Sequence, residues 1–202
     1  MTSPESAIFL PDHPGYTLRP MGAEEAQQRL EPHLQGMFAN NFRLKLSGLY
    51  SDQELSARKR LQSNMGTPFR LTWGLYHDDS FAGWTFGWQV DRETYYMTNS
   101  AVLPEHRRKG LYTAMLQILL ARLTEEGFQI IFSRHTATNN AVLIPKLKFG
   151  FVLSSFELSD VHGTLVHLRY YTNPTRRAAM DVRSGQRQPV DAMAAAFGLP
   201  PL

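Results

Sequence analysis

The 202-residue chain contains no cysteine. Disulfide bonds, a thiol nucleophile and a thiolate-bound zinc ion are therefore excluded, and a cytoplasmic location is expected. No stretch reaches the roughly 18 consecutive apolar residues that a transmembrane helix needs. The opening residues, MTSPESAIFLPDHPGY, lack the basic start and apolar centre of a signal peptide. We expect neither a leader sequence nor a membrane anchor.

Charge is also sparse, because charged residues make up 19% of the chain and the net charge is +3. This composition argues against a disordered or coiled-coil protein, and it fits a binder of small anions without requiring nucleic acid. The sequence has no GxxxxGK[ST], GxGxxG, HExxH or GxSxG motif. Its histidines are not at close metal-ligand spacing, so no metal site is expected.

Apolar residues account for 43% of the chain and aromatic residues for 11%, which is enough to build one sizeable core. Residues 1–15 contain three prolines and read as a loose arm. The folded domain is expected over residues 16–172, and residues 173–202 form a tail rich in Arg, Ala and Pro.

Hydrophobic periodicity predicts the elements of this domain. Alternation predicts an antiparallel meander from Phe69–Tyr76, a strand through Trp84 and Val90, and Thr94–Leu103. Helical spacing follows over Gly110–Glu126, and the next strand, Gln129–Arg134, should run parallel to Thr94–Leu103 by a right-handed crossover. The remaining expected elements are strand Tyr16–Met21, helices within Ala23–Ser47, Asp52–Asn64 and Asn139–Phe149, and a hairpin of Phe151–Leu158 with Thr164–Tyr171.

These elements predict an α/β fold with a mixed, mostly antiparallel sheet flanked by helices. Its most informative segment is residues 102–115, VLPEHRRKGLYTAM, which joins a strand to a helix through three consecutive cations and Gly110. The first amides of a helix have no intrahelical partner and carry the positive end of its dipole. The turn is therefore either a phosphate or pyrophosphate site or an ordinary solvated loop.

The same segment resembles the acetyl-CoA-binding motif of the GNAT-type N-acetyltransferases, which is V-x-P followed by [Q/R]-x-x-G-x-[G/A]. Val102, Pro104, Arg107 and Gly110 match in order and spacing, whereas Tyr112 stands where the family usually has Gly or Ala. A second family segment, N-x-x-A-x-x-L-Y-x-K-x-G-F, resembles NNAVLIPKLKFGF over residues 139–151. Its matching residues are Asn139, Lys148, Gly150 and Phe151.

The resemblance implies a GNAT-like fold and an acetyl-CoA co-substrate. The backbone near Val102 would pair with the pantetheine amides, and an amide at Val102 or Leu103 would polarise the thioester carbonyl. The turn amides would hold the pyrophosphate, with Asn139 beside the pantetheine arm. The implied cofactor-binding residues are Ala101, Val102, Leu103, Arg107, Arg108, Lys109, Gly110, Leu111, Tyr112, Thr113 and Asn139.

The catalytic acid departs from the family pattern. Many members place a tyrosine that protonates the leaving thiolate where this chain has Lys146, preceded by Pro145, which should distort the helix. Lys146 could donate that proton, although a solvated or coenzyme-facing lysine is the simpler interpretation. Tyr170 or Tyr171 could substitute, but the sequence does not locate them.

His135 is the first candidate for a general base, because it ends the strand before Asn139 and its ordinary pKa is near neutrality. A strand-end histidine bonded to nearby backbone is the competing interpretation. Glu93 and Glu105 are weaker candidates. The polar residues of the central strand, Thr98, Asn99 and Ser100, could orient substrate or water.

The aromatic residues Phe69, Trp73, Trp84 and Trp88 are expected in the core, whereas Tyr95 and Tyr96 could line an acceptor pocket. We expect acetyl transfer from acetyl-CoA to a primary amine of a small molecule or peptide. A non-catalytic acyl-CoA-binding module on the same fold remains an alternative. The tail could contact nucleic acid, but a net charge of about +2 is small for that. It could equally pack on a second subunit through Met193, Phe197 and Leu199.

Overall fold

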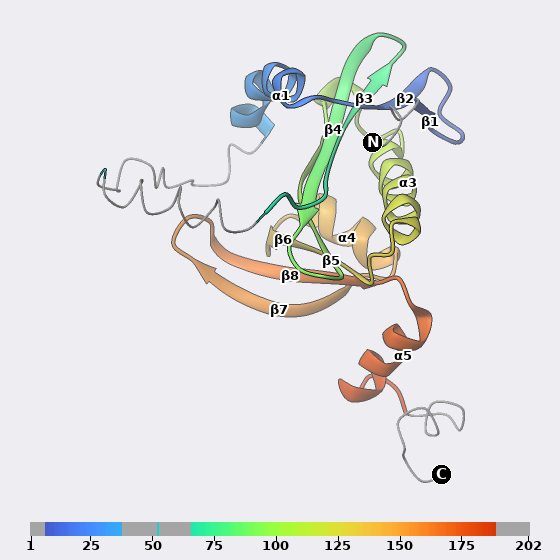
Figure 1. The fold of residues 1–202 in the computed structure, drawn as a ribbon, viewed down its shortest axis with the longest axis vertical. Helices are drawn as coiled ribbons and strands as arrows, with labels where there is room; N and C mark the ends of the chain where they lie inside the picture. The colour runs from blue at the N-terminus through green and yellow to red at the C-terminus, as the bar shows by residue number, and fades with distance from the viewer. Residues whose placement is uncertain (1–6, 38–51, 53–65, 189–202) are drawn as a thin grey trace.

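The computed structural model describes residues 7–37, 52 and 66–188. These residues form one eight-stranded sheet in the order β1-β2-β3-β4-β5-β6-β8-β7 (Figure 1). Every neighbouring pair is antiparallel except β5 and β6, which are parallel. The strands are β1 (Ile8–Phe9), β2 (Tyr16–Pro20), β3 (Arg70–His77), β4 (Ser80–Gln89), β5 (Thr94–Val102), β6 (Ile130–Thr136), β7 (Val152–Ser159) and β8 (Gly163–Tyr171).

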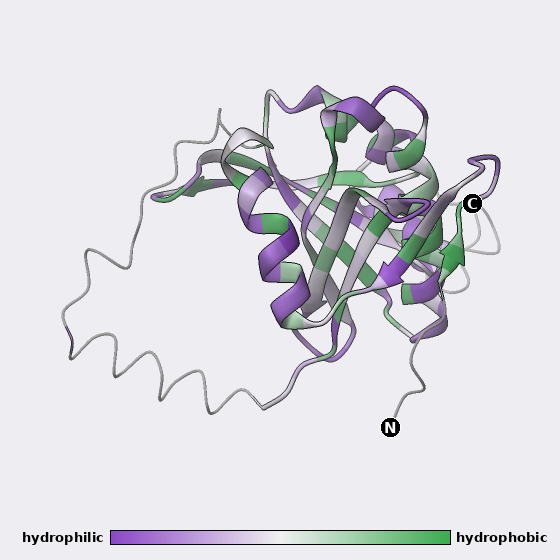
Figure 2. Cartoon of the chain, turned by 90° about the horizontal axis from the view of Figure 1, so that it is seen from above, coloured by the Kyte–Doolittle hydropathy of each residue, from purple (hydrophilic) through white to green (hydrophobic). Residues whose placement is uncertain are grey.

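Helices cover the two faces of this sheet. The described helices are α1 (Ala23–Met37), α3 (Leu111–Glu125), α4 (Asn140–Lys148) and α5 (Pro174–Arg183), with a short 3-10 turn, η2, at Pro104–His106. The larger core cluster joins α3 to one face of the sheet through Leu116, Leu119 and Leu123. A smaller cluster lies under α1, whose Leu30 packs with Trp84. Figure 2 shows the outer surface of α1 as mostly hydrophilic, as expected for a helix with one buried side. Among the described helices, none is long and apolar enough to cross a membrane.

The predicted crossover is confirmed, since β5, α3 and the parallel strand β6 follow one another as expected. The meander and the final hairpin are also present. Three features were not predicted. Part of the expected loose arm pairs with β2 as β1, β8 lies between β6 and β7, and the tail begins with α5. The expected helix Asp52–Asn64, apart from Asp52, and residues 38–47 of the expected helical segment Ala23–Ser47 lie outside the described residues.

The parallel strands β5 and β6 are hydrogen-bonded to each other along only part of their length. Thr94, Tyr95 and Tyr96 pair with Ile130, Ile131 and Phe132, and beyond this point the two strands no longer pair. A bulge in β5 accompanies the divergence, because Phe86 pairs with Asn99 but Gly87 pairs with Met97, which leaves Thr98 as the extra residue. The carboxyl ends of two parallel strands thus lie apart in the middle of the sheet. In open α/β sheets this is where ligands bind.

Candidate active site

Two cavities meet where β5 and β6 part. We call the first the basic cavity; it has a volume of about 820 Å³ and is lined by the end of β5, the 106–113 turn and the start of α4. The second, the aromatic cavity, has a volume of about 740 Å³ and is lined by α1, the middle strands, β6 and the β7–β8 turn. Five residues line both cavities and define what we call the junction: Ser100, Tyr112, Thr136, Asn139 and Val142.

The basic cavity brings together most of the predicted cofactor-binding residues. Nine of the eleven line it: Ala101, Val102, Arg107, Arg108, Gly110, Leu111, Tyr112, Thr113 and Asn139. Leu103 is buried, and neither it nor Lys109 is among the lining residues. Most of the residues predicted to bind the cofactor therefore lie together around one cavity.

The basic turn has the backbone shape of an anion-binding nest. Arg108 has φ +60° and Gly110 has φ +76°, so left-handed residues alternate through the turn. Gly110 is the N-cap of α3 and has no side chain to occupy the first amides of the helix. The amides at Leu111, Tyr112 and Thr113 therefore remain to bind an anion on the positive end of the helix dipole.

The three cations of the turn have different roles. The Arg107 guanidinium reaches back to the strand, where its Nε donates to the Val102 carbonyl at 3.0 Å. Lys109 lies 3.2 Å from the Tyr16 hydroxyl, and its carbonyl is contacted by His13 Nε2 at 2.7 Å. Arg108 is exposed. It is thus the cation of the turn best placed to reach a bound anion.

The two backbone amides considered as oxyanion donors are not equivalent. The Leu103 amide donates to the Ala82 carbonyl at 2.8 Å, so it is already used within the sheet. Successive amides in a strand point to opposite edges, which directs the Val102 amide toward the open space beside β6. Of the two, Val102 is the residue whose amide can meet a ligand.

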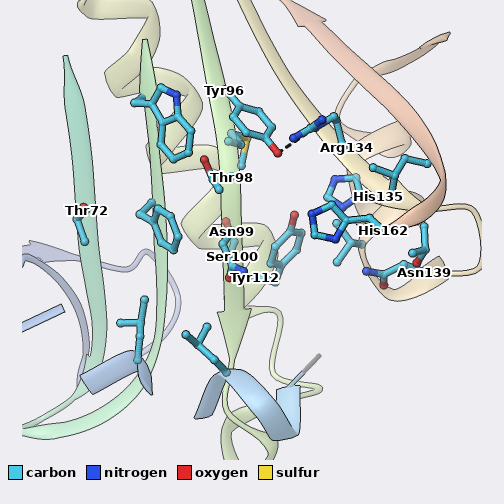
Figure 3. A pocket seen from close by; sticks show the side chains of 18 of the residues that line it. Thr72, Tyr96, Thr98, Asn99, Ser100, Tyr112, Arg134, His135, Asn139 and His162 are labelled. Atoms are coloured by element: carbon cyan, nitrogen blue, oxygen red, sulfur yellow. Dashed lines mark hydrogen bonds between the residues drawn. The ribbon is translucent and has the colours of Figure 1, made fainter. Parts of the chain in front are cut away.

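Asn139 occupies the N-cap position of α4 without capping it. Its side chain makes no capping hydrogen bond, and the amides of Val142 and Leu143 donate to its backbone carbonyl. The side-chain amide is among the groups that line the junction (Figure 3). It can therefore donate and accept there. The helix continues through Pro145 to Lys148, which brings Lys146 inward.

Lys146 is buried, with 1% of its surface exposed. Its ammonium donates to the Ser133 hydroxyl at 2.7 Å, and the same hydroxyl lies 2.9 Å from His135 Nε2. Ser133 is itself fully buried on β6. The interpretation of Lys146 as a solvated residue is wrong. Lys146, Ser133 and His135 form a continuous hydrogen-bonded group, which we call the lysine relay, and both of its ends line the aromatic cavity.

Burial changes the acid–base chemistry of both ends of the relay. Desolvation lowers the pKa of Lys146 to about 7, because the charged ammonium has little water around it. Desolvation, followed by repulsion from Lys146, lowers the pKa of His135 to about 2. The imidazole is therefore neutral at physiological pH, and Lys146 is the group that titrates near neutrality.

Aromatic rings and one ion-pair network line part of the aromatic cavity. Trp88 and Tyr96 line it and meet edge to face with centroids 5.4 Å apart. Arg134 also lines it, donating to the Tyr96 hydroxyl at 3.1 Å and to both Glu157 oxygens at 3.0 and 3.1 Å (Figure 3). Placing Trp88 in the core was therefore wrong, and Tyr96 was correctly assigned to the pocket wall.

Tyr95 was assigned to the pocket as well, but it is fully buried in the main core with Phe69 and Phe128. No pattern in the sequence predicted the ion pair between Arg134 and Glu157. It depends on the order β6-β8-β7, which brings residues 23 positions apart into contact.

The other acid–base candidates lie elsewhere. Glu93 pairs with Arg176 at 2.8 Å, and this bond lowers the pKa of the Glu93 carboxyl. Glu105 is exposed in η2. Tyr170 packs on Phe151, and neither Tyr170 nor Tyr171 lines either cavity. Thr98, Asn99 and Ser100 do line the aromatic cavity, with Asn99 accepting from Trp84 Nε1 at 2.9 Å and Ser100 lying 2.8 Å from Thr85 Oγ1.

A split parallel strand pair, an anion nest at the following helix and a cleft beyond it fit the fold that the resemblance to the GNAT-type acetyltransferases implies. The model of the acetyltransferase (GNAT) family matches residues 37–151, more than half of the chain. The chain belongs to the GNAT family of acetyltransferases. No curated protein matches it in sequence.

Solved structures agree on the fold. The ribosomal-protein-S5-alanine acetyltransferase from Vibrio fischeri is similar with a TM-score of 0.61 and 9% identity, covering 84% of this chain and 98% of that one. The ribosomal-protein-S18-alanine N-acetyltransferase from Escherichia coli has a TM-score of 0.54 and 19% identity, covering 77% and 93%. A GNAT family acetyltransferase from Elizabethkingia anophelis with acetyl-CoA bound has a TM-score of 0.53 and 11% identity, covering 78% and 99%.

Proposed function

We propose that this protein transfers the acetyl group of acetyl-CoA to a primary amine by direct attack on the thioester. The observation that carries the proposal is the junction. It places a cavity with an anion nest and a strand amide against a cavity that contains a buried, hydrogen-bonded lysine. A donor and an acceptor bound in the two cavities would meet there. Much of the rate enhancement would come from this positioning.

The residues of the basic cavity fit the chemistry of acetyl-CoA. The nest amides and Arg108 would hold the pyrophosphate, the Asn139 side chain would bond to a pantetheine amide, and the Val102 amide would polarise the thioester carbonyl. Acetyl-CoA supplies an activated acyl carbon with a thiolate leaving group. The chain supplies binding, orientation and proton transfer.

The lysine relay would manage the proton. As the amine nitrogen bonds to the carbonyl carbon, the carbon–sulfur bond breaks, the amine loses one proton and the sulfur leaves as a thiolate. His135 Nδ1, the ring nitrogen not bonded to Ser133, would accept the amine proton while Nε2 passes its own through Ser133 to neutral Lys146. The relay then holds the proton that neutralises the thiolate. His135, with a pKa of about 2, is too weak a base to hold the proton by itself. Lys146, with a pKa of about 7, is basic enough to hold it.

The aromatic cavity favours acceptors with an apolar or aromatic body. Phe86, Trp88 and Tyr96 line it, and Glu31 is the one carboxylate among its described lining residues. A single carboxylate offers little charge to balance a polycationic amine. We therefore expect a monoamine or a peptide amino group with an apolar neighbour.

The test is release of CoA from acetyl-CoA against a broad panel of amines, with Arg108→Ala and His135→Ala run beside the native protein. We expect turnover with an apolar primary amine, a raised KM for acetyl-CoA in Arg108→Ala and a reduced kcat in His135→Ala. Undiminished turnover in His135→Ala would remove the imidazole from the mechanism. Thermal stabilisation by acetyl-CoA without turnover of any amine would indicate a non-catalytic binding module, and no stabilisation would refute both functions.

A further inference from the structure

The hydroxyl of Tyr112 is a buried polar group whose hydrogen-bonding capacity is unmet. Tyr112 lies in the first turn of α3, two residues after Gly110, and its ring packs against the main core cluster. Its oxygen is inaccessible to solvent and makes no hydrogen bond with any described residue. In Figure 3 the ring stands in the gap between Asn99 and Ser100 on one side and His135 and His162 on the other.

Leaving a hydroxyl buried and unpaired has a measurable cost. Such a group typically destabilises a fold by about 1–3 kcal/mol, and each case in a native structure calls for an explanation. Two other hydroxyls share this condition among the described residues, those of Tyr95 and Thr98. Tyr95 lines neither cavity, and Thr98 lines only the aromatic one. Tyr112 alone of the three belongs to the junction.

The acyl transfer expected at the junction would be assisted by a hydrogen-bond donor such as the Tyr112 hydroxyl. When the amine adds to the thioester, the carbonyl oxygen gains negative charge, and it loses that charge when the carbon–sulfur bond breaks. The Val102 amide offers one hydrogen bond to this oxygen, and an oxyanion is best stabilised by two preorganised donors. A phenol is well suited to be the second, because burial raises the pKa of Tyr112 and keeps its proton in place.

We propose that Tyr112 is a further catalytic residue, whose hydroxyl donates a hydrogen bond to the carbonyl oxygen of the acyl group at the junction. The hydroxyl keeps its proton throughout, so no proton is exchanged with the substrate. This role rests on the proposed acetyl transfer and assigns a function to the residue that departs from the family motif. The bulky side chain replaces a small residue of the binding turn and brings a donor that the backbone there cannot supply.

The decisive variant is Tyr112→Phe, which removes only the oxygen. We expect kcat to fall about 100-fold, as when one oxyanion donor is removed, with the KM for acetyl-CoA raised only about 3-fold, the effect of one net hydrogen bond in the ground state. Thermal stability should stay the same or rise, because the unpaired hydroxyl is gone. Tyr95→Phe is the matched control: it removes an equally buried, unpartnered hydroxyl, and its kcat should equal that of the native protein.

A binding measurement separates this inference from the proposed function. S-ethyl-CoA lacks the carbonyl oxygen, so calorimetry should show native protein binding acetyl-CoA more tightly than S-ethyl-CoA. Tyr112→Phe should reduce that ratio by about 3-fold or more, the effect of one net hydrogen bond. If no amine is turned over but the ratio still falls, the acyl-transfer proposal fails and the hydrogen bond stands. An unchanged ratio, or a kcat equal to that of the native protein, overturns the role of Tyr112.

Discussion

The two halves of the β5–β6 pair use the same strands and differ in what occupies the space between them. In the paired half, Thr94–Tyr96 bonds to Ile130–Phe132, and Tyr95 and Ile131 are fully buried in the main core. In the open half, the strands part and the space is lined by Lys146, Tyr112 and Thr98, which carry polar groups. The paired half bonds its backbone within the sheet and packs its side chains in the main core. The open half places polar side chains on the walls of a cavity.

From this contrast we expect stability and chemistry to be separated along the strand pair. Substitutions in the paired half should lower the free energy of unfolding and leave turnover of the folded protein unchanged. Substitutions in the open half should lower turnover and leave the free energy of unfolding unchanged or raise it. The reason is that buried polar groups reduce stability, and groups of this kind with shifted pKa values are typical of reactive sites.

The largest expected effect is the pH dependence of stability that arises from Lys146. The pKa of Lys146 is about 7 in the folded protein, against an ordinary value of 10.5 that applies to the unfolded chain. Between pH 7 and pH 10.5 the unfolded chain therefore binds more protons than the folded protein. The free energy of unfolding should therefore rise from pH 7 to pH 10.5, by up to about 5 kcal/mol at roughly 1.4 kcal/mol per pKa unit. Urea unfolding at several pH values measures this slope. Lys146→Met should flatten it, and equal slopes in the two proteins would contradict the prediction.

Removing a buried side chain from the paired half should destabilise the fold by leaving a cavity in the core. Ile131→Ala removes a fully buried side chain beside Tyr95 and should lower the free energy of unfolding by about 2–5 kcal/mol. Chemical denaturation checks this value, and kcat per folded molecule at low temperature should stay within about 2-fold of native. A large loss of kcat in the folded variant would show that the two halves are not separable.

The open half should lose activity without losing the fold when its lysine is replaced. Lys146→Met should lower kcat about 100-fold, the scale of general acid–base catalysis, and abolish the rise in kcat with an apparent pKa near 7. Lys148→Met is the control, because Lys148 is exposed on the same helix and its replacement should change neither quantity. A native pH–rate profile in Lys146→Met would exclude the relay.

The smallest expected effect concerns the basic turn. Arg108→Ala should raise the dissociation constant of acetyl-CoA about 10-fold, a loss of roughly 1.4 kcal/mol, with kcat little changed. Lys109→Ala should weaken binding less, because Lys109 contacts Tyr16. Titration calorimetry at two salt concentrations distinguishes them. An equal or larger loss for Lys109→Ala would reverse our assignment of the cations.

Local pattern was enough to predict the meander, the crossover and the basic turn. Alternation along β3 places Leu71, Trp73 and Leu75 on one buried face, and Gly110 marks the start of α3. The position of β8 could not be predicted, because a hairpin pattern pairs β7 with β8 without saying which of them meets β6. The contact between Arg134 and Glu157 depends on that choice.

The parts of the candidate site formed by backbone groups could be predicted from the sequence. The parts formed by buried side chains could be predicted less well. A motif read along one segment located the nest and Val102. The burial of Lys146 depends on β6, since its partner Ser133 lies 13 residues earlier on another element. Trp88 and Tyr95 were misplaced because alternation tells which residues share a face but not where a strand leaves its neighbour. The bulge at Thr98 begins that departure.

The walls of the aromatic cavity come from distant parts of the chain. The basic cavity is lined mainly by β5, the basic turn and α4, whereas α1 and the turn at His162 line the aromatic cavity. Under the proposed function these segments would contact the amine, and only the end of α1, at Gly36 and Met37, also lines the basic cavity. Exchanging residues 23–34 and the turn at His162 for those of another protein of this architecture should redirect the choice of amine with little change in acetyl-CoA binding, which makes these two segments natural units for recombination.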